Sequence, residues 1–117
     1  MNRWVLLGIV IFLLAGILAT PKWSPEEERA IEIGREFFEN IGNQPGKVLS
    51  VNLVHIDEVS DGYLFYWHSA AGLETPDVPE PEWCWVVRFE QGLRPGHWWE
   101  VLIDVNTAEV VGGMSCR

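Results

Sequence analysis

The spacing of apolar side chains changes twice along the chain. Residues 4–19 contain no polar side chain. Between residues 24 and 41, apolar side chains recur at intervals of three and four, which is the period of a helix with one buried face. After Gly46 they recur at every second position, as in strands with one buried face. The pattern predicts an apolar N-terminal segment, one helix and then a series of strands.

The helix predicted over residues 24–41 has recognisable start and stop signals. Ser24 and Glu27 fit the S-x-x-E pattern of a capping box, and Gly42 follows the last apolar position. The expected buried stripe consists of Ala30, Ile33, Phe37, Phe38 and Ile41. The opposite face carries mainly glutamates, which we interpret as solvent-exposed surface.

Strands are predicted near residues 47–57, 62–69, 82–90, 98–105 and 109–112. We expect the first two to form a hairpin with a tight turn at residues 58–61. Residues 70–81 contain three prolines and no basic residue, so we interpret them as a loop. The strands are therefore expected to form an antiparallel meander that packs on the helix.

The third and fourth predicted strands have a register that their own side chains define. Placing Phe89 opposite Trp99 gathers apolar side chains on one face and puts Arg88 opposite Glu100. A slip of one residue would mix apolar and polar side chains on both faces. The expected core face consists of Trp83, Trp85, Val87, Phe89, Trp99, Val101, Ile103 and Val105. The buried stripe of the helix is the natural partner of this face.

The first predicted hairpin is apolar on both of its faces. Either the sheet curls so that part of its back is covered, or an apolar patch remains open. Open apolar patches of this kind mark surfaces that bind partners or ligands. We predict an interaction surface that consists of Val51, Leu53, Leu64 and Tyr66 of this hairpin together with Trp98.

The apolar segment at residues 4–19 is longer than most signal-peptide cores and slightly shorter than most membrane-spanning helices. Trp4 and Trp23 flank it, as interfacial aromatic side chains do. No cysteine follows the segment, so it does not resemble a bacterial lipid-anchor signal. We predict that residues 1–23 are an uncleaved transmembrane anchor, with a signal peptide cleaved near Ala19 as the alternative.

The charges that flank this segment indicate its orientation. The α-amine and Arg3 precede it, whereas Glu26, Glu27 and Glu28 follow soon after it. The positive-inside rule then places the N-terminus in the cytoplasm and residues 24–117 outside. We expect a single-pass cell-membrane protein with an extracytoplasmic domain, or a secreted domain if the segment is cleaved.

Charge and aromatic content exclude two broad classes of protein. The formal net charge of −9 is opposite to the basic face that a nucleic-acid-binding protein needs. Seven Trp, five Phe and two Tyr supply far more buriable surface than a disordered chain carries. The chain is therefore expected to fold, and we expect no nucleic-acid partner.

The end of the chain resembles the PepSY family, whose domains have an aromatic-containing strand followed by D-x-x-T-G-x-V. Asp104, Thr107 and Val110 fit this pattern, while Ala108 stands at the glycine position and tolerates a left-handed conformation poorly. The resemblance covers about residues 26–112. It implies a cystatin-like α+β shape and an extracytoplasmic, often membrane-attached module that binds or restrains peptidases without catalytic residues of its own. The Q-x-V-x-G inhibitory loop of cystatins is missing.

The three histidines do not have the spacing of a metal site. In the predicted hairpin His55 and His68 lie about 13 Å apart along the strand at about 3.3 Å per residue, too far to share one zinc ion. No H-x-x-H or C-x-x-C pattern includes them or His97. Catalytic motifs are also absent from the sequence, so we expect no metal, no other cofactor and no enzyme activity.

Cys84 and Cys116 are the only cysteines. An even cysteine count outside the cytoplasm favours one disulfide. The predicted register argues against it, because Cys84 lies level with Asp104 while an extended last strand carries Cys116 towards Trp99. The sequence leaves both outcomes open.

These observations predict an α+β protein in which an N-terminal membrane helix precedes one helix packed on a four- to five-stranded antiparallel meander. The leading hypothesis for its function is a non-enzymatic extracytoplasmic interaction module that binds or restrains a peptidase or another envelope protein. The alternative is a carrier of an apolar small molecule in an aromatic-lined concavity.

Overall fold

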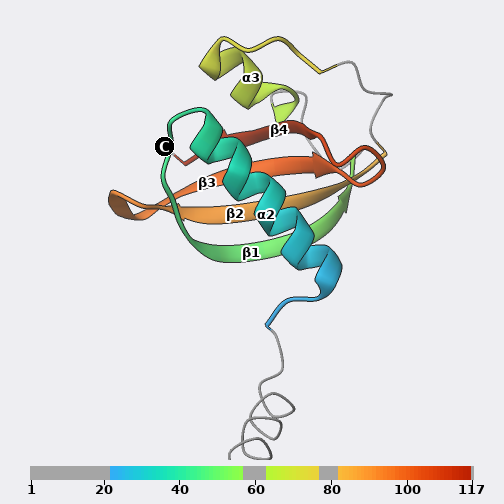
Figure 1. Cartoon of the computed structure of the whole chain (residues 1–117), viewed down its shortest axis with the longest axis horizontal. Helices are drawn as coiled ribbons and strands as arrows, with labels where there is room; N and C mark the ends of the chain where they lie inside the picture. The colour runs from blue at the N-terminus through green and yellow to red at the C-terminus, as the bar shows by residue number, and fades with distance from the viewer. Residues whose placement is uncertain (1–21, 57–62, 77–81, 117) are drawn as a thin grey trace, which may run out of the picture.

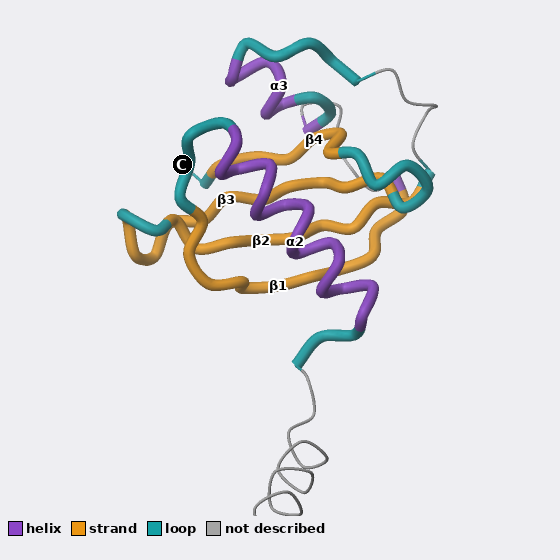
Figure 2. The backbone as a smooth tube through the Cα atoms, viewed as in Figure 1, coloured by secondary structure: helices purple, strands orange, loops and turns teal. Residues whose placement is uncertain are grey.

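A long helix crosses one face of a four-stranded antiparallel sheet, and a short helix lies beside one edge of it (Figures 1 and 2). The computed structural model describes residues 22–56, 63–76 and 82–116. In chain order the elements are α2 (Pro25–Asn40), β1 (Pro45–His55), α3 (Tyr66–Ala71), β2 (Trp83–Gln91), β3 (Arg94–Asp104) and β4 (Val110–Ser115). The predicted α+β class, with one helix packed on an antiparallel meander, is confirmed.

The capping box predicted for α2 is present. The Glu27 backbone N–H donates to the Ser24 hydroxyl (3.2 Å), and the Ser24 backbone N–H donates to a Glu27 carboxylate oxygen (2.9 Å). These two bonds satisfy donors that the first turn of a helix otherwise leaves unpaired. At the other end Gly42 has a φ of +88°, a conformation that glycine adopts without strain.

Gly34 allows α2 to lie close to the sheet. It is buried together with Ala30 and Phe38, while Ile33 and Phe37 of the predicted stripe are only partly buried. A Cβ atom at residue 34 would lie 2.9 Å from a methyl group of Val101 and 3.1 Å from the ring of Phe89. The apolar pattern of the sequence does not mark this position, because glycine has no apolar side chain.

The predicted pairing of the third and fourth strands is confirmed as the β2–β3 register. Phe89 pairs with Trp99 and Arg88 with Glu100, and the Arg88 guanidinium lies 2.8 Å from the Glu100 carboxylate. Four residues of the expected core face are buried beneath α2, namely Val87, Phe89, Val101 and Ile103. Trp83 and Val105 are exposed instead, since Trp83 is the first residue of β2 and Val105 follows the last residue of β3.

The predicted hairpin between residues 47–57 and 62–69 is wrong. β1 pairs with β2, and the second segment contains helix α3 rather than a strand. Among the described residues of that segment, only Leu64 makes a strand-like contact, an isolated bridge to Gly112 of β4. The predicted turn at 58–61 lies outside the described residues.

The loop predicted at residues 70–81 begins at Gly72 and not at Ala70, because α3 continues to Ala71. Its last five residues, 77–81, are not described.

The back of the sheet is covered at one end, which explains why the first predicted hairpin was apolar on both faces. Three residues of this face are almost fully buried, Cys84, Leu102 and Val111. They pack against Ile56, Tyr63, Phe65 and Val86. The segment before α3 thus covers part of the back of the sheet, and the Phe65 backbone N–H donates to the Val111 carbonyl (2.8 Å).

Trp67 connects α3 to the core. Its ring packs edge-to-face on Phe38, with a centroid distance of 4.9 Å, and its indole N–H donates to the Glu100 carbonyl of β3 (2.7 Å). To reach that carbonyl the ring passes directly over Gly113, where any Cβ atom would collide with the indole. The close approach requires glycine at this position.

The D-x-x-T segment forms a closed turn between β3 and β4. One Asp104 carboxylate oxygen accepts hydrogen bonds from the Thr107 backbone N–H (3.1 Å) and the Thr107 hydroxyl (2.6 Å). Ala108 has a φ of +61°, so alanine occupies the left-handed conformation that it tolerates poorly. The turn has this conformation although the residue at position 108 is alanine and not glycine.

Gly113→Ala is expected to lower the free energy of unfolding by about 3 kcal/mol, because the new methyl group collides with the Glu100 carbonyl and the Trp67 indole and breaks the hydrogen bond between them. The matched control is Gly42→Ala, which adds the same group in open space at a positive φ. This control is expected to lower the free energy of unfolding by about 1 kcal/mol. That is the lower end of the cost of a left-handed backbone conformation for a residue with a side chain. Urea unfolding followed by circular dichroism compares the two, and equal losses would contradict the role given to Trp67.

Candidate functional site

The five residues predicted as one interaction surface do not lie together. Val51 is buried in the core, whereas Leu53 on the same strand is 50% exposed. Leu64 pairs with β4, on the opposite edge of the sheet from β1, and Tyr66 belongs to α3. Trp98 lies under the Arg88 guanidinium, 3.8 Å from its ring centroid. The predicted surface took its residues from both strands of the predicted hairpin. Because that hairpin does not form, these residues lie on different elements.

The outer edge of β1 is an open sheet edge within the described part of the chain. The sheet order is β1-β2-β3-β4, so β1 has a strand neighbour on one side only. The Ile56 backbone N–H donates to the Glu82 carbonyl (2.9 Å), and main-chain groups alternate in direction along a strand. By this alternation the N–H and C=O groups of Val51 and Leu53 point away from β2.

The open edge is regular only after a bulge. The β1–β2 register shifts between Val48 and Ser50, and pairing then continues without interruption to the end of β1. Between Lys47 and His55 the strand contains no charged residue and no proline. Charged side chains and prolines are the devices that normally prevent an edge strand from pairing, so this stretch is unprotected.

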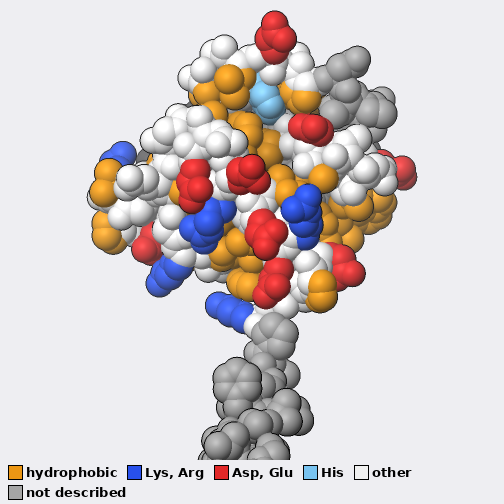
Figure 3. Space-filling view, in the orientation of Figure 1, with side chains coloured by type: hydrophobic (Ala, Val, Ile, Leu, Met, Phe, Trp, Pro, Cys, Tyr) orange, Lys and Arg blue, Asp and Glu red, His pale blue; other side chains and the backbone are white. Residues whose placement is uncertain are grey.

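A cleft of about 290 Å³ lies where α2, α3 and the turn before β4 meet. Its walls consist of Arg29, Ile33, Glu36, Phe37 and Asn40 of α2, His68 of α3, and Ala108, Glu109 and Val110. Figure 3 shows that both apolar and acidic side chains gather on the face that carries α2. The elements predicted from the sequence did not place α2, α3 and the turn before β4 next to one another.

His68 is 7% exposed, and its Nδ1 atom is buried without a hydrogen-bond partner among the described residues. The imidazole packs against Phe37 and Phe65, at centroid distances of 5.5 and 6.0 Å. This burial lowers the pKa of His68 below its ordinary value, and the negative charge of Glu109 opposes the effect. His68 is therefore a neutral hydrogen-bonding group at neutral pH.

The aromatic side chains of the core face pack on one another. The ring of Phe38 contacts Trp67, Phe89 and Trp99, at centroid distances of 4.9, 5.7 and 5.4 Å. A second open cavity, of about 320 Å³, lies beside the β2–β3 turn and is lined by Trp99 and Leu93 together with polar side chains. The rings expected to line a ligand concavity are thus largely engaged in the core.

Cys84 and Cys116 are free thiols. Cys84 pairs with Asp104, whereas the Cys116 backbone N–H donates to the Trp98 carbonyl, about 20 Å further along β3 at about 3.3 Å per residue. The register argument against a disulfide therefore agrees with the structure. The Trp98 backbone N–H also donates to the Cys116 sulfur (3.1 Å), which lies 3.5 Å from Nδ1 of His97.

The three histidines belong to different elements, His55 to β1, His68 to α3 and His97 to β3. Among the residues that the structure describes, no three His, Cys, Asp or Glu side chains converge in a way that suits a metal ion. His55 packs on Trp83 (4.8 Å between ring centroids) and lies 3.9 Å from the Glu82 carboxylate.

The predicted anchor at residues 4–19 lies outside the described residues. Within residues 22–56, 63–76 and 82–116 no helix is long and apolar enough to cross a membrane. Comparison with protein-family models finds no match to this chain. No curated protein and no solved structure matches it either.

In the folded protein a maleimide is expected to label Cys116 and leave Cys84 unmodified. Cys84 is fully buried, and burial together with the Asp104 charge raises its pKa to about 11, so its reactive thiolate form is scarce. Mass spectrometry should find one label per folded chain and two after unfolding in urea. Cys116→Ser should leave the folded chain unlabelled; two labels on the folded wild type, or none in urea, would contradict the structure.

The free energy of unfolding is expected to fall as the pH drops from 7 to 5.5, partly because of His68. Its folded pKa is lowered, so below the unfolded value of 6.5 the unfolded chain binds more protons and becomes relatively more stable. In His68→Phe, which keeps an aromatic ring between Phe37 and Phe65, this pH dependence should be shallower. Urea unfolding of the wild type and of His68→Phe at pH 7 and 5.5 tests this prediction. If the free energy of unfolding falls by the same amount in both proteins, His68 does not contribute to the pH dependence.

Proposed function

We propose that this protein is a non-enzymatic interaction module that binds another protein outside the cytoplasm, at the membrane surface. The observation that carries the proposal is the open edge of β1. An exposed edge presents a row of unpaired backbone donors and acceptors, to which an extended segment of another protein adds as a further strand.

Binding by strand addition fits the details of β1. The backbone groups of Val51 and Leu53 supply the hydrogen bonds, and the exposed Leu53 side chain supplies apolar contact beside them. The bulge near Leu49 limits the usable edge to the residues that follow it. The opposite edge is less available, because Leu64 and Phe65 already bond to β4.

The location in this proposal rests on the N-terminal sequence. Residues 4–19 serve as a membrane anchor, and the positive-inside rule places the acidic domain on the outer side. Cleavage near Ala19 would release the same domain as a secreted protein. In either case the partner is extracytoplasmic.

The resemblance to PepSY domains suggests the kind of partner, a peptidase or another envelope protein. The hydrogen-bonded Asp104–Thr107 turn and the order of helix and strands support this part of the proposal. An apolar-ligand carrier is less well supported, because Phe38, Trp67 and Trp99 pack on one another in the core.

Leu53→Pro is expected to abolish partner binding without unfolding the domain. Proline removes a backbone N–H that points away from β2, so the β1–β2 ladder keeps its hydrogen bonds. Leu53→Ala, which removes the side chain and keeps the N–H, is the matched control and should only weaken binding. A photo-crosslinking residue at the exposed position Asn52, in the full chain expressed in its source cells, should give one covalent adduct.

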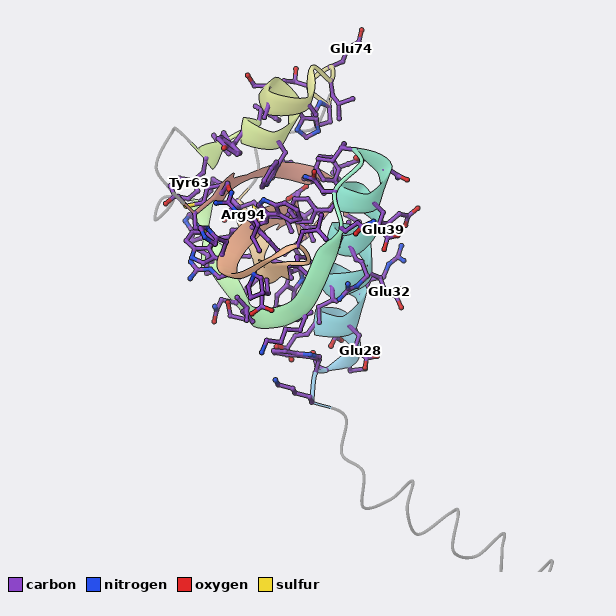
Figure 4. The ribbon with its side chains drawn as sticks, turned by 90° about the vertical axis from the view of Figure 1, so that its left-hand side faces the viewer. Glu28, Glu32, Glu39, Tyr63, Glu74 and Arg94 are labelled. Carbon is purple, nitrogen blue, oxygen red and sulfur yellow. The ribbon has the colours of Figure 1, made fainter. Side chains whose placement is uncertain are left out.

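The same crosslinking residue at Glu74, which projects from the end of the molecule that carries α3 (Figure 4), should give no such adduct. The proposal fails if the Asn52 adduct persists in Leu53→Pro or never forms. An adduct that joins two copies of this chain would also contradict it, since β1 would then serve self-association. Thermal unfolding checks that each variant remains folded.

A further inference from the structure

The open edge of β1 lies on the side of the domain at which the described chain begins. The C-terminal end of α2 packs against α3, where Phe38 contacts Trp67 (4.9 Å between ring centroids). From there the helix crosses the sheet, so that its N-terminus lies on the β1 side (Figures 1 and 2). Its 16 residues are about 24 Å long at about 1.5 Å per residue. Glu28 near the start of α2 and Glu74 after α3 therefore lie at opposite ends of the domain (Figure 4).

Trp23 fixes the point at which the chain enters the domain on this side. Its ring is partly buried and packs against the core cluster that contains Ala30 and Val51. The Lys22 ammonium lies 5.1 Å from the centroid of the same ring. Tryptophan and lysine are side chains that commonly flank membrane spans at the water interface. Trp23 thus belongs to the folded domain, and the connection to the predicted anchor begins at a fixed position.

This connection is short. Three residue steps separate Ala19, the last residue of the apolar segment, from Lys22, and an extended chain spans at most about 3.6 Å per step. The start of the domain therefore lies within about 11 Å of the end of the predicted anchor. A strand adds beside β1 at a spacing of about 4.8 Å, whereas a folded domain of about 100 residues has a radius of gyration of about 13 Å. The space on the β1 side suits an extended segment better than a folded domain.

The exposed groups of β1 also suit the neighbourhood of a bilayer. Leu49 and Leu53 are exposed, and no charged residue lies between Lys47 and His55. The backbone groups that point away from β2 are costly to leave unpaired where water is scarce. A strand that runs along the bilayer surface would supply both the hydrogen bonds and the apolar contacts.

We propose that the strand which pairs with β1 is the extracytoplasmic juxtamembrane segment of an integral membrane protein. The short connection at Lys22 holds the β1 edge close to the bilayer, and a segment that has just left the membrane lies at the same height. The inference rests on the proposed function, since it takes both the anchor and the strand addition from it. It adds the class of the partner and the part of the partner that binds.

The orientation is tested without the partner, in the full chain reconstituted into phosphatidylcholine vesicles that contain a lipid with a nitroxide headgroup. A bimane fluorophore is attached at Asn52→Cys or at Glu74→Cys, each combined with Cys116→Ser, because Cys84 is buried and stays unlabelled. The nitroxide should cause a large loss of fluorescence at position 52 and a small loss at position 74, because α2 separates the two ends of the domain by about 24 Å. Equal losses at the two positions would overturn the inference.

A rigid spacer tests whether the partner segment is reached only next to the bilayer. Four EAAAK repeats inserted between Thr20 and Pro21 form a largely helical spacer of about 30 Å and move the domain away from the membrane. The yield of the Asn52 adduct should then fall at least about tenfold, because the edge no longer meets the segment. The same repeats appended after Arg117 are the matched control and should leave the yield unchanged. An adduct that persists with the inserted spacer, or that is lost equally in the control, overturns the inference.

Mass spectrometry of the adduct identifies the partner residue that is joined to position 52. We expect it within about ten residues of an apolar stretch of about 20 residues, the length that spans a bilayer. A soluble partner, or a crosslinked residue far from any such stretch, overturns this inference and leaves the proposed function in place. Natural protein that lacks residues 1–19 would have the same consequence, since the domain would then be free of the membrane. Absence of any adduct at position 52 overturns both.

Discussion

The packing of Trp67 over Gly113 is the contact on which most of the remaining architecture depends. The indole bonds to the Glu100 carbonyl and contacts Phe38, so a single ring joins α3, β3 and α2. This contact needs a residue without a side chain at position 113. It also fixes α3 at the end of α2, and the cleft lined by His68 exists only because α3 is held there.

The same segment makes the two edges of the sheet unequal. Tyr63, Leu64 and Phe65 run along β4 and over the adjacent back of the sheet before α3 begins, so that edge is partly satisfied. No described segment does the same for β1. An edge that lacks charges and prolines over the stretch that follows Lys47 is a liability in solution unless something pairs with it. We interpret this asymmetry as a consequence of function rather than of folding.

The open edge of β1 and the cleft lined by His68 lie on different parts of the molecule. β1 forms one edge of the sheet, whereas α3 lies near the opposite edge (Figure 1). The cleft is lined by residues of α2, α3 and the turn before β4. Between them the outer side of α2 carries acidic side chains such as Glu28, Glu32 and Glu39, which project away from the sheet (Figure 4). This acidic surface therefore separates the β1 edge from the cleft.

The sequence alone determined the features that depend on neighbouring residues or on one hairpin. Ser24 and Glu27 define the start of α2 within four residues, and the alternation around Phe89 and Trp99 permits one β2–β3 register. Within residues 62–69 the positions 63–67 form an unbroken apolar and aromatic run, so their periodicity does not separate a strand from a helix. Only the tertiary structure decided this, because Trp67 becomes buried against Gly113, 46 positions later in the chain, and no local pattern reports a contact between residues so far apart.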